Sequence, residues 1–172
     1  MRVLGVDPGT IVAGYGVIDS DAGRVKMVEY GVIKANQKLA PAVRLSIMYK
    51  GLMKVLKEYK PDVCAVEHPF VGENVSSALA IGRAQAVVML IAANNDIPIF
   101  EYAPAKVKQS VASYGASSKE QIQQMVRLHL NLTEIPEPFD AADALAIALC
   151  HINENHINNL VIEKPEKKRR PR

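Results

Sequence analysis

The alternation of apolar and polar residues at the start of the chain predicts strands joined by short turns. Residues 2–6 form an apolar run that ends at the turn signal Asp-Pro-Gly, and weaker alternation follows over residues 14–19 and 24–34. The last two runs are separated by Asp21-Ala22-Gly23, a hairpin-type turn. Short connections between such runs are typical of antiparallel strands. The start of the chain therefore predicts a three-stranded meander.

The pattern changes at Pro41, after which apolar residues recur at helical spacing. Helices are predicted over residues 41–59, 76–94, 104–113, 118–130 and 139–155, and further strands over residues 63–67 and 97–102. Ser76 or Ser77 suits the N-cap of the second helix. A meander followed by alternating strands and helices predicts an α/β fold, with a mixed five-stranded sheet and helices on both faces.

Composition narrows the class of protein. A chain of 172 residues with 49% hydrophobic content suits one compact domain. No apolar run approaches the ~18–20 residues that span a bilayer, and the N-terminus lacks the layout of a signal peptide, so we expect no membrane segment. Cys64 and Cys150 stand far apart without a CxxC spacing. We therefore expect reduced core cysteines in a cytoplasmic protein, with neither a disulfide framework nor a zinc site.

The net charge of +3 is concentrated in the C-terminal tail. The last ten residues, EKPEKKRRPR, carry six basic and two acidic side chains, so the rest of the chain sums to −1. We expect residues 1–156 to form the domain and residues 157–172 to form a basic, flexible tail. Two interpretations of the tail stay open: a solubilising terminus, or an arm that binds phosphates in a salt-dependent way.

Four of the acidic residues stand at the ends of predicted elements, beside strongly apolar sequence. Asp7 ends the first strand and Glu67 ends the strand VCAVE. Asp140 and Asp143 open the last helix, three residues apart and therefore on one face. Each alone has an ordinary explanation: a turn residue, an exposed strand end, or acids favoured by the helix dipole. Together they predict a site, provided that the strand ends and the last helix meet.

Four carboxylates in one small space predict a divalent metal site. Each negative charge raises the pKa of the others, and bound cations remove that conflict. Mg²⁺ prefers oxygen ligands and substrate phosphates, and two ions ~3.5–4 Å apart support an in-line phosphoryl displacement. We therefore expect two Mg²⁺ ions held by these four acids; the sequence leaves open whether Mn²⁺ replaces Mg²⁺. His68 adjoins Glu67, and we expect it to be solvated or to support a ligand rather than to bind metal.

Five segments of the chain resemble the RuvC family, the bacterial Holliday-junction resolvases. They are, in order along residues 2–155, GVDPGTIVAGYGVID, AVEHPFVGENVSSALAIGRAQAVV, FEYAPAKVKQSV, SSKEQIQQMV and FDAADALAIALCH. The resemblance implies a ribonuclease H-like fold, a homodimer, and Mg²⁺-dependent nicking of two symmetric strands of a four-way DNA junction. It also implies a branch-migration motor, RuvA and RuvB, as partner in recombination and DNA repair. The family's four catalytic acids fall on Asp7, Glu67, Asp140 and Asp143.

The resemblance also marks residues that are expected to face DNA. The family's aromatic residue after the catalytic Glu falls on Phe70, whose apolar side chain suits packing against opened junction bases. The family's DNA-facing lysines fall on Lys108 and Lys119, whereas Lys106 and Arg83 are local additions of this chain. Without the family, these basic residues are interpreted either as phosphate contacts or as solvated helix faces.

The chain departs from the family pattern in the second segment. Glu73 and Ala80 stand where family members often have lysine. Arg83 and Gln85 stand in the reverse of the family's more usual order, Gln before Arg. These departures concern phosphate contacts in this region rather than the chemistry.

Three other functions stay open on the sequence. Residues 5–10 resemble the first phosphate loop of actin-like and sugar-kinase-like ATPases, but no second glycine-rich phosphate loop follows. A related nuclease that cleaves RNA or RNA–DNA hybrids is also possible, and only Phe70 and the five-segment match favour a junction nuclease instead. A catalytically inactive DNA-binding module is disfavoured because all four acids are present.

Overall fold

One mixed sheet forms the centre of the molecule. The structure is a computed structural model and describes residues 1–68, 75–112 and 117–162, with side chains through residue 156. The strands of the sheet are β1 (Arg2–Asp7), β2 (Val12–Asp21), β3 (Arg24–Lys34), β4 (Val63–Glu67) and β5 (Ile99–Tyr102). Their order is β3-β2-β1-β4-β5, antiparallel from β1 to β3 and parallel from β1 to β5. The predicted mixed five-stranded sheet is confirmed.

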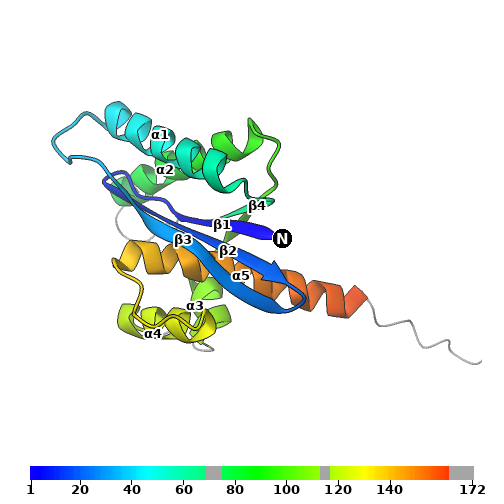
Figure 1. The fold of residues 1–172 in the computed structure, drawn as a ribbon. Coiled ribbons are helices and arrows are strands. Elements are labelled where there is room, and N and C mark those ends of the chain that lie inside the picture. Colours follow the sequence, from blue (N-terminus) through cyan, green and yellow to red (C-terminus); the bar gives the residue numbers. More distant parts are fainter. Residues whose placement is uncertain (69–74, 113–116, 163–172) are drawn as a thin grey trace, which may run out of the picture.

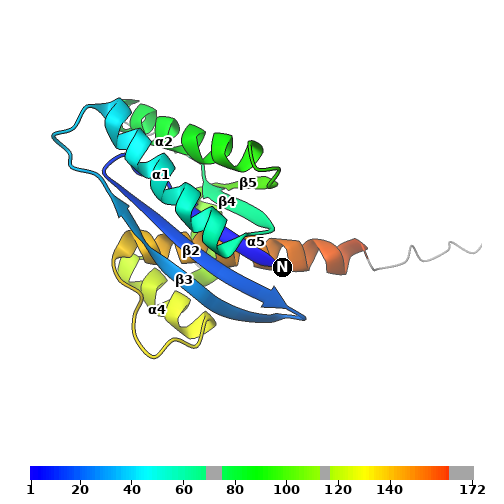
Figure 2. The ribbon, with the colours of Figure 1, turned by 45° about the horizontal axis from the view of Figure 1, so that its top comes forward.

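Helices cover both faces of this sheet, as predicted. They are α1 (Pro41–Tyr59), α2 (Val75–Ala93), α3 (Pro104–Ala112), α4 (Lys119–His129) and α5 (Phe139–Ile162). α1 and α2 lie side by side on one face, and α3, α4 and α5 lie on the other (Figures 1 and 2). Each face has its own apolar core, because alternate residues of the buried strands point to opposite sides.

Helix α5 lies directly on glycines of the two central strands. A Cβ on Gly5 would overlap the carbonyl oxygen of Ala144, and a Cβ on Gly14 would overlap that of Asp140. Gly16, which pairs with Gly5 across β1 and β2, also lies close to α5, since a Cβ there would meet the Leu145 side chain at 2.7 Å and its backbone nitrogen at 2.9 Å. The Ala-rich sequence of α5 suits a close approach to the sheet, and the glycines explain how the helix backbone reaches it.

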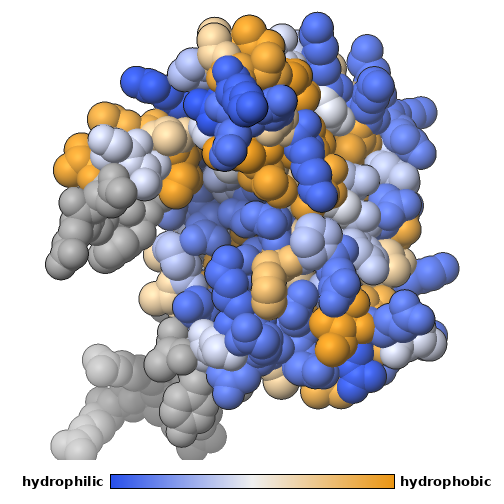
Figure 3. Space-filling model, turned by 90° about the vertical axis from the view of Figure 1, so that its left-hand side faces the viewer, coloured by the Kyte–Doolittle hydropathy of each residue, from blue (hydrophilic) through white to orange (hydrophobic). Residues whose placement is uncertain are grey.

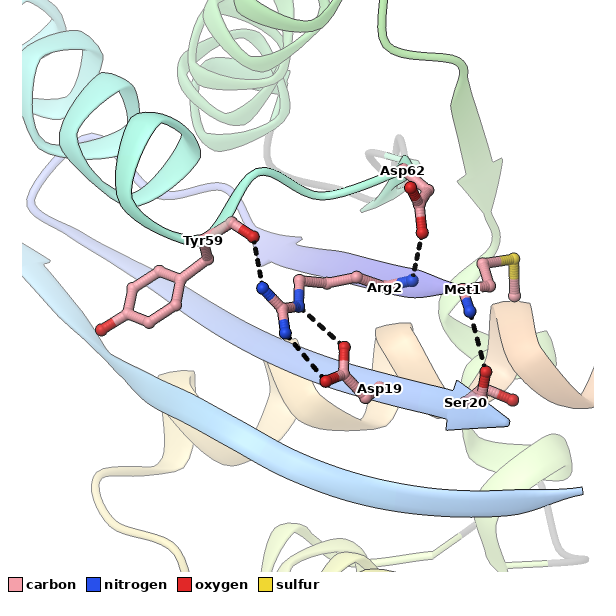
Figure 4. A network of polar contacts seen from close by, with 6 residues as sticks. All are labelled: Met1, Arg2, Asp19, Ser20, Tyr59 and Asp62. Carbon is pink, nitrogen blue, oxygen red and sulfur yellow. Dashed lines mark hydrogen bonds and ion pairs between the residues drawn. The ribbon is translucent and has the colours of Figure 1, made fainter. Parts of the chain in front are cut away.

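A polar network ties down the end of β1 that is remote from Asp7 (Figure 4). The Arg2 guanidinium donates to both carboxylate oxygens of Asp19, at 2.7 and 2.8 Å, and to the carbonyl oxygen of Tyr59 at 2.7 Å. The Arg2 backbone N–H donates to the Asp62 carboxylate at 2.6 Å. Together these bonds join β1 to β2 and to the connection between α1 and β4, so the central strands share one fixed register.

Helix α2 differs from its predicted description in two ways. It begins at Val75, so Ser76 and Ser77 lie inside its first turn and neither is the predicted N-cap. It is also long and apolar enough to cross a membrane by length and composition, although polar residues interrupt every long apolar run in the sequence. One such helix is weak evidence for a membrane, since core helices of soluble proteins pass the same test. Only 28% of this stretch is buried, so α2 presents an exposed apolar side.

Other element boundaries shift without changing the fold. The hairpin turn confirms its signal, since Ala22 and Gly23 both have positive φ angles, 45° and 80°. α5 continues to Ile162 rather than ending at residue 155, because no Gly or Pro interrupts its sequence. The boundary that we placed after residue 156 therefore lies inside α5, and residues 163–172 of the tail lie outside the described residues.

Candidate active site

The ends of β1 and β4 place two of the predicted acids side by side. The parallel register of these strands leaves Asp7 and Glu67 at neighbouring positions on one edge of the sheet. Val3 and Ala65, which share their strand faces, pack in the core beneath α5, so both acids point toward the α5 face. The carboxyl ends of parallel strands are also where open α/β sheets bind their ligands.

The start of α5 brings the other two acids to the same edge. Gly14 pairs with Asp7 across β1 and β2, and Gly14 also meets the Asp140 backbone. The first turn of α5 therefore lies beside Asp7, with Asp143 one turn further along the same helix face. Figure 3 views this end of the molecule, where hydrophilic surface occupies the centre.

The pKa values record how close the four carboxylates are. Burial, followed by the negative charges of Glu67, Asp143 and Asp140, raises the pKa of Asp7 to about 7. Burial also raises the pKa of Glu67 and that of Asp143. Asp143 adds to the rise at Glu67, and Asp140 adds to the rise at Asp143. Repulsion of this kind means that the site resists full ionisation unless cations enter it.

Helix α4 brings one of the predicted lysines to the acids. A capping box at Ser118 and Gln121 fixes the start of α4, with Lys119 as its first residue. Lys119 Nζ lies 3.6 Å from Asp143 Oδ2 and 5.9 Å from the ring centroid of Phe139. The Lys119 side chain is 64% exposed, so the ammonium group is open to solvent while its charge lowers the pKa of three of the acids.

The two lysines of α3 lie in different surroundings. Lys108 is close enough to Glu67 and Asp143 to lower the pKa of both carboxyl groups. Lys106 instead pairs with Glu154 at 2.7 Å, a residue roughly 16 Å further along α5 than Asp143 by helical rise. The structure therefore brings Lys108 to the acids and Lys106 to a neighbouring ion pair.

The remaining predicted DNA-facing residues are Arg83 and Phe70. Arg83 is exposed on α2. Phe70 lies outside the described residues, so its wedge role stays a prediction. Arg127, a further basic residue of α4, lines a separate groove together with Glu134 and Glu137.

The carboxylate oxygens of the four acids are the type of ligand that a hard divalent cation prefers, although these side chains do not surround a single point. Over the described parts of the chain, no group of three or more His, Cys, Asp or Glu side chains is arranged to hold a metal ion. The carboxylates line an open edge instead. Mg²⁺ commonly takes only one or two protein carboxylates and completes its shell with waters and substrate phosphates. Oxygen donors that repel one another at an open edge suit that mode of binding.

Sequence reasoning missed two features that build this site. The glycines of β1 and β2 were interpreted as strand and turn residues, although Gly5 and Gly16 are what allow α5 to reach the sheet. The signal in the sequence was the alternate spacing of Gly14 and Gly16 in one strand. The Ser118–Gln121 capping box could also have been predicted from its three-residue spacing.

Four carboxylates at the edge of a mixed sheet, with lysines beside them, define a nuclease-type site.

Comparisons with known proteins agree with this class. The family described as crossover junction endodeoxyribonuclease RuvC matches residues 3–151. A protein of that name from Dehalococcoides mccartyi is 50% identical over 161 residues, which cover 94% of this chain and 96% of the relative. Another, from Desulforamulus reducens, is 47% identical over 151 residues, covering 88% and 93%.

Solved structures give the same result. The chain resembles Thermus thermophilus RuvC in complex with a Holliday junction substrate, with a TM-score of 0.85, 33% identity, and coverage of 92% of this chain and 96% of that one. It shares its fold with the yeast mitochondrial Holliday junction resolvase Ydc2, with a TM-score of 0.63, 14% identity, and coverage of 94% and 85%. The chain belongs to the RuvC family of crossover junction endodeoxyribonucleases. It is therefore a junction-resolving endonuclease, and the ribonuclease H-like fold is confirmed.

Proposed function

We propose that Asp7, Glu67, Asp140 and Asp143 are the catalytic residues and that together they hold two Mg²⁺ ions. The observation that supports this most is the meeting of the four acids at one sheet edge, where burial and the neighbouring negative charges raise the pKa of Asp7, Glu67 and Asp143. Bound Mg²⁺ or Mn²⁺ supplies a water of lowered pKa and stabilises the leaving oxygen of a phosphodiester.

The protein's own groups orient the substrate around this edge. Asp7, at the centre of the cluster, would hold both ions. Lys119 and Lys108 provide positive charge on the α4 and α3 side, which attracts the DNA backbone toward an otherwise acidic surface. Cleavage in this arrangement leaves a 5′-phosphate and a 3′-hydroxyl, ends that can be ligated.

The junction itself calls for two such sites. A four-way junction presents two symmetric strands, so two cuts need two active sites related by the same symmetry. We propose a cytoplasmic homodimer whose nuclease domain includes the whole of α5. RuvA and RuvB, the branch-migration motor, are its proposed partners in recombination and repair, with no membrane association.

The exposed side of α2 supports the dimer. Val75, Leu79, Met89 and Leu90 are all exposed there, between 37% and 59%, and helical spacing places them in one row. An apolar row along a single helix is self-complementary, as the interface of a twofold dimer requires. Arg83, one turn after Leu79, borders this row. If Arg83 is buried in the dimer interface, it cannot also make the predicted contact with DNA.

A charge in this row should separate the dimer. In Leu90→Lys, whose side chain is 59% exposed, we expect the dimer dissociation constant to rise by at least about 100-fold, roughly 2.7 kcal/mol. The matched control is Leu128→Lys on α4, where the side chain is 58% exposed. Sedimentation across a concentration series measures the change. Equal dimerisation of both variants would remove α2 from the interface.

Loss of Lys119 should weaken binding in a salt-dependent way. In Lys119→Ala we expect junction affinity to fall and the slope of log Kd against log salt to decrease by about one, since one phosphate contact is lost. Lys26→Ala, exposed at the far hairpin, is the control. Titrations at several salt concentrations in EDTA measure both. An unchanged slope would show that Lys119 acts only on the acids.

The proposal as a whole is tested by a nicking assay. A synthetic four-way junction, a linear duplex and an RNA–DNA hybrid are incubated with the protein in Mg²⁺ or in EDTA. We expect paired, symmetric nicks in the junction with Mg²⁺ only. Preferential cleavage of the hybrid would favour the related RNA-directed nuclease instead.

A further inference from the structure

A second polar cluster lies beneath the other face of the same sheet edge. Gln85 Nε2 donates to Glu101 Oε2 at 2.6 Å, and His68 Nδ1 lies 3.1 Å from the same oxygen. The cluster joins α2, β5 and the residue that follows β4. None of its members belongs to the proposed catalytic set, although His68 is the chain neighbour of Glu67.

The Gln85 amide is buried, so it needs its hydrogen bond to Glu101. Gln85 is 6% exposed and sits on an otherwise apolar face of α2. A buried amide without a partner is costly, so Gln85 holds the Glu101 carboxylate in a defined place. The Gln85 position is also where the order of Gln and Arg in the chain departs from the family pattern.

Glu101 in turn sets the orientation of the His68 ring. An ionised carboxylate can only accept hydrogen bonds, so the Nδ1 of His68 carries the hydrogen that faces Glu101. This hydrogen bond fixes the orientation of the His68 ring with the hydrogen on Nδ1, and His68 Nε2 points away from Glu101. The pair is partly exposed, at 62% for His68 and 38% for Glu101, so its contribution to overall stability is small.

The end of β4 is where this orientation matters. The His68 backbone N–H donates to the Tyr102 carbonyl oxygen at 2.8 Å, and Glu67 pairs with Tyr102 in the sheet. Successive strand residues point to opposite faces, so holding His68 against Glu101 holds Glu67 toward the α5 side. If the His68 side chain were not held by Glu101, the direction of the Glu67 carboxylate at the end of β4 would be less well fixed.

We propose that Gln85, Glu101 and His68 form a positioning unit that holds the end of β4 and thereby aims the Glu67 carboxylate. The proposal rests on the catalytic role of Glu67 proposed above. His68 acts through its Nδ1 contact with Glu101, and it neither binds metal nor contacts DNA.

Two substitutions at His68 separate positioning from DNA contact. The amide of His68→Asn reproduces the Nδ1 side of the ring and can still donate to Glu101, whereas the longer amide of His68→Gln reaches the Nε2 position. We measure the single-turnover cleavage rate of a four-way junction at saturating protein with Mg²⁺, and junction Kd in EDTA. His68→Ala and Glu101→Ala should lower the rate by about 10-fold to 100-fold, the range typical of residues that orient metal ligands. Junction Kd should stay close to that of the wild type in both variants, and so should the melting temperature of His68→Ala. Glu101→Ala leaves the buried Gln85 amide without its partner, so its melting temperature should fall.

Rescue and non-additivity complete the test. His68→Asn and Glu101→Gln, which keep the hydrogen bonds, should retain most of the rate, and the double variant His68→Ala/Glu101→Ala should be no slower than the slower single variant. His156→Ala, an exposed histidine on α5, is the matched control and should leave the rate unchanged. Full activity of His68→Ala, additive losses in the double variant, rescue by Gln rather than Asn, or a loss confined to Kd would each overturn the positioning role.

The parent proposal fails separately. Glu67→Gln is measured in the same assay, and if it still cleaves, the catalytic assignment of Glu67 is wrong. An inactive Glu67→Gln beside a fully active His68→Ala contradicts the positioning unit alone.

Discussion

Asp7→Asn should abolish junction cleavage, with a rate loss of about a thousandfold or more, corresponding to about 4 kcal/mol of transition-state stabilisation. Asp7 lies at the centre of the acidic edge, where its pKa responds to the other three acids and to Lys119. An amide has the same shape but cannot supply the charge that two shared cations need. Single-turnover nicking of a four-way junction in Mg²⁺ measures the loss.

Binding should survive this substitution. Removing one negative charge from the site does not remove a phosphate contact, so junction Kd should stay within about tenfold, ~1.4 kcal/mol. Asp21→Asn, at the exposed hairpin far from the edge, is the matched control and should cleave normally. Retained cleavage by Asp7→Asn would refute the shared-metal role.

The same substitution should change how stability depends on pH. Folding raises the pKa of Asp7 to about 7, against about 3.9 when unfolded. Between these values the folded state binds more protons, so wild-type stability falls as pH rises from about 4 to about 7 and stays lower above that. Asn does not ionise and escapes this loss. Without divalent cations, Asp7→Asn should exceed the wild type at pH 8 by at least about 1.4 kcal/mol, and the gain should vanish near pH 4.

Gly5→Ala should have the largest effect on folding. The added Cβ would overlap the carbonyl oxygen of Ala144 and approach the Ala148 backbone nitrogen to 2.8 Å. Both obstacles are helix backbone, so α5 must shift as a unit. We expect a loss of about 3 kcal/mol or more in the free energy of unfolding. Because α5 carries two of the acids, the surviving folded protein should also cleave more slowly.

A second glycine provides the control. Gly82 lies in the interior of α2, where a Cβ meets no atom within 4 Å, and Gly82→Ala should stabilise by up to about 1 kcal/mol through helix propensity. Urea unfolding at one fixed protein concentration compares the two variants. A stable, active Gly5→Ala would mean that α5 does not depend on this close approach.

The sequence by itself determined the elements and the identity of the acids. Period-two and helical spacing placed β3 and β4 at their observed bounds, because these patterns reflect which side of each element is buried. Asp7 and Glu67 were notable in the sequence because a charged residue at the end of an apolar strand requires a binding partner if it is buried. The five matched segments carried the family, and with it the junction as substrate.

Only the tertiary structure decided which of these residues meet. The parallel pairing of β1 with β4 sets Asp7 beside Glu67, and the glycines beneath α5 bring Asp140 to them. Lys119 and Lys106 are alike in the sequence, yet one faces Asp143 and the other Glu154. Contacts of this kind depend on strand order and on the approach of backbones far apart in the chain. Local patterns carry no information about either, which is why the convergence of the four carboxylates had to come from the fold.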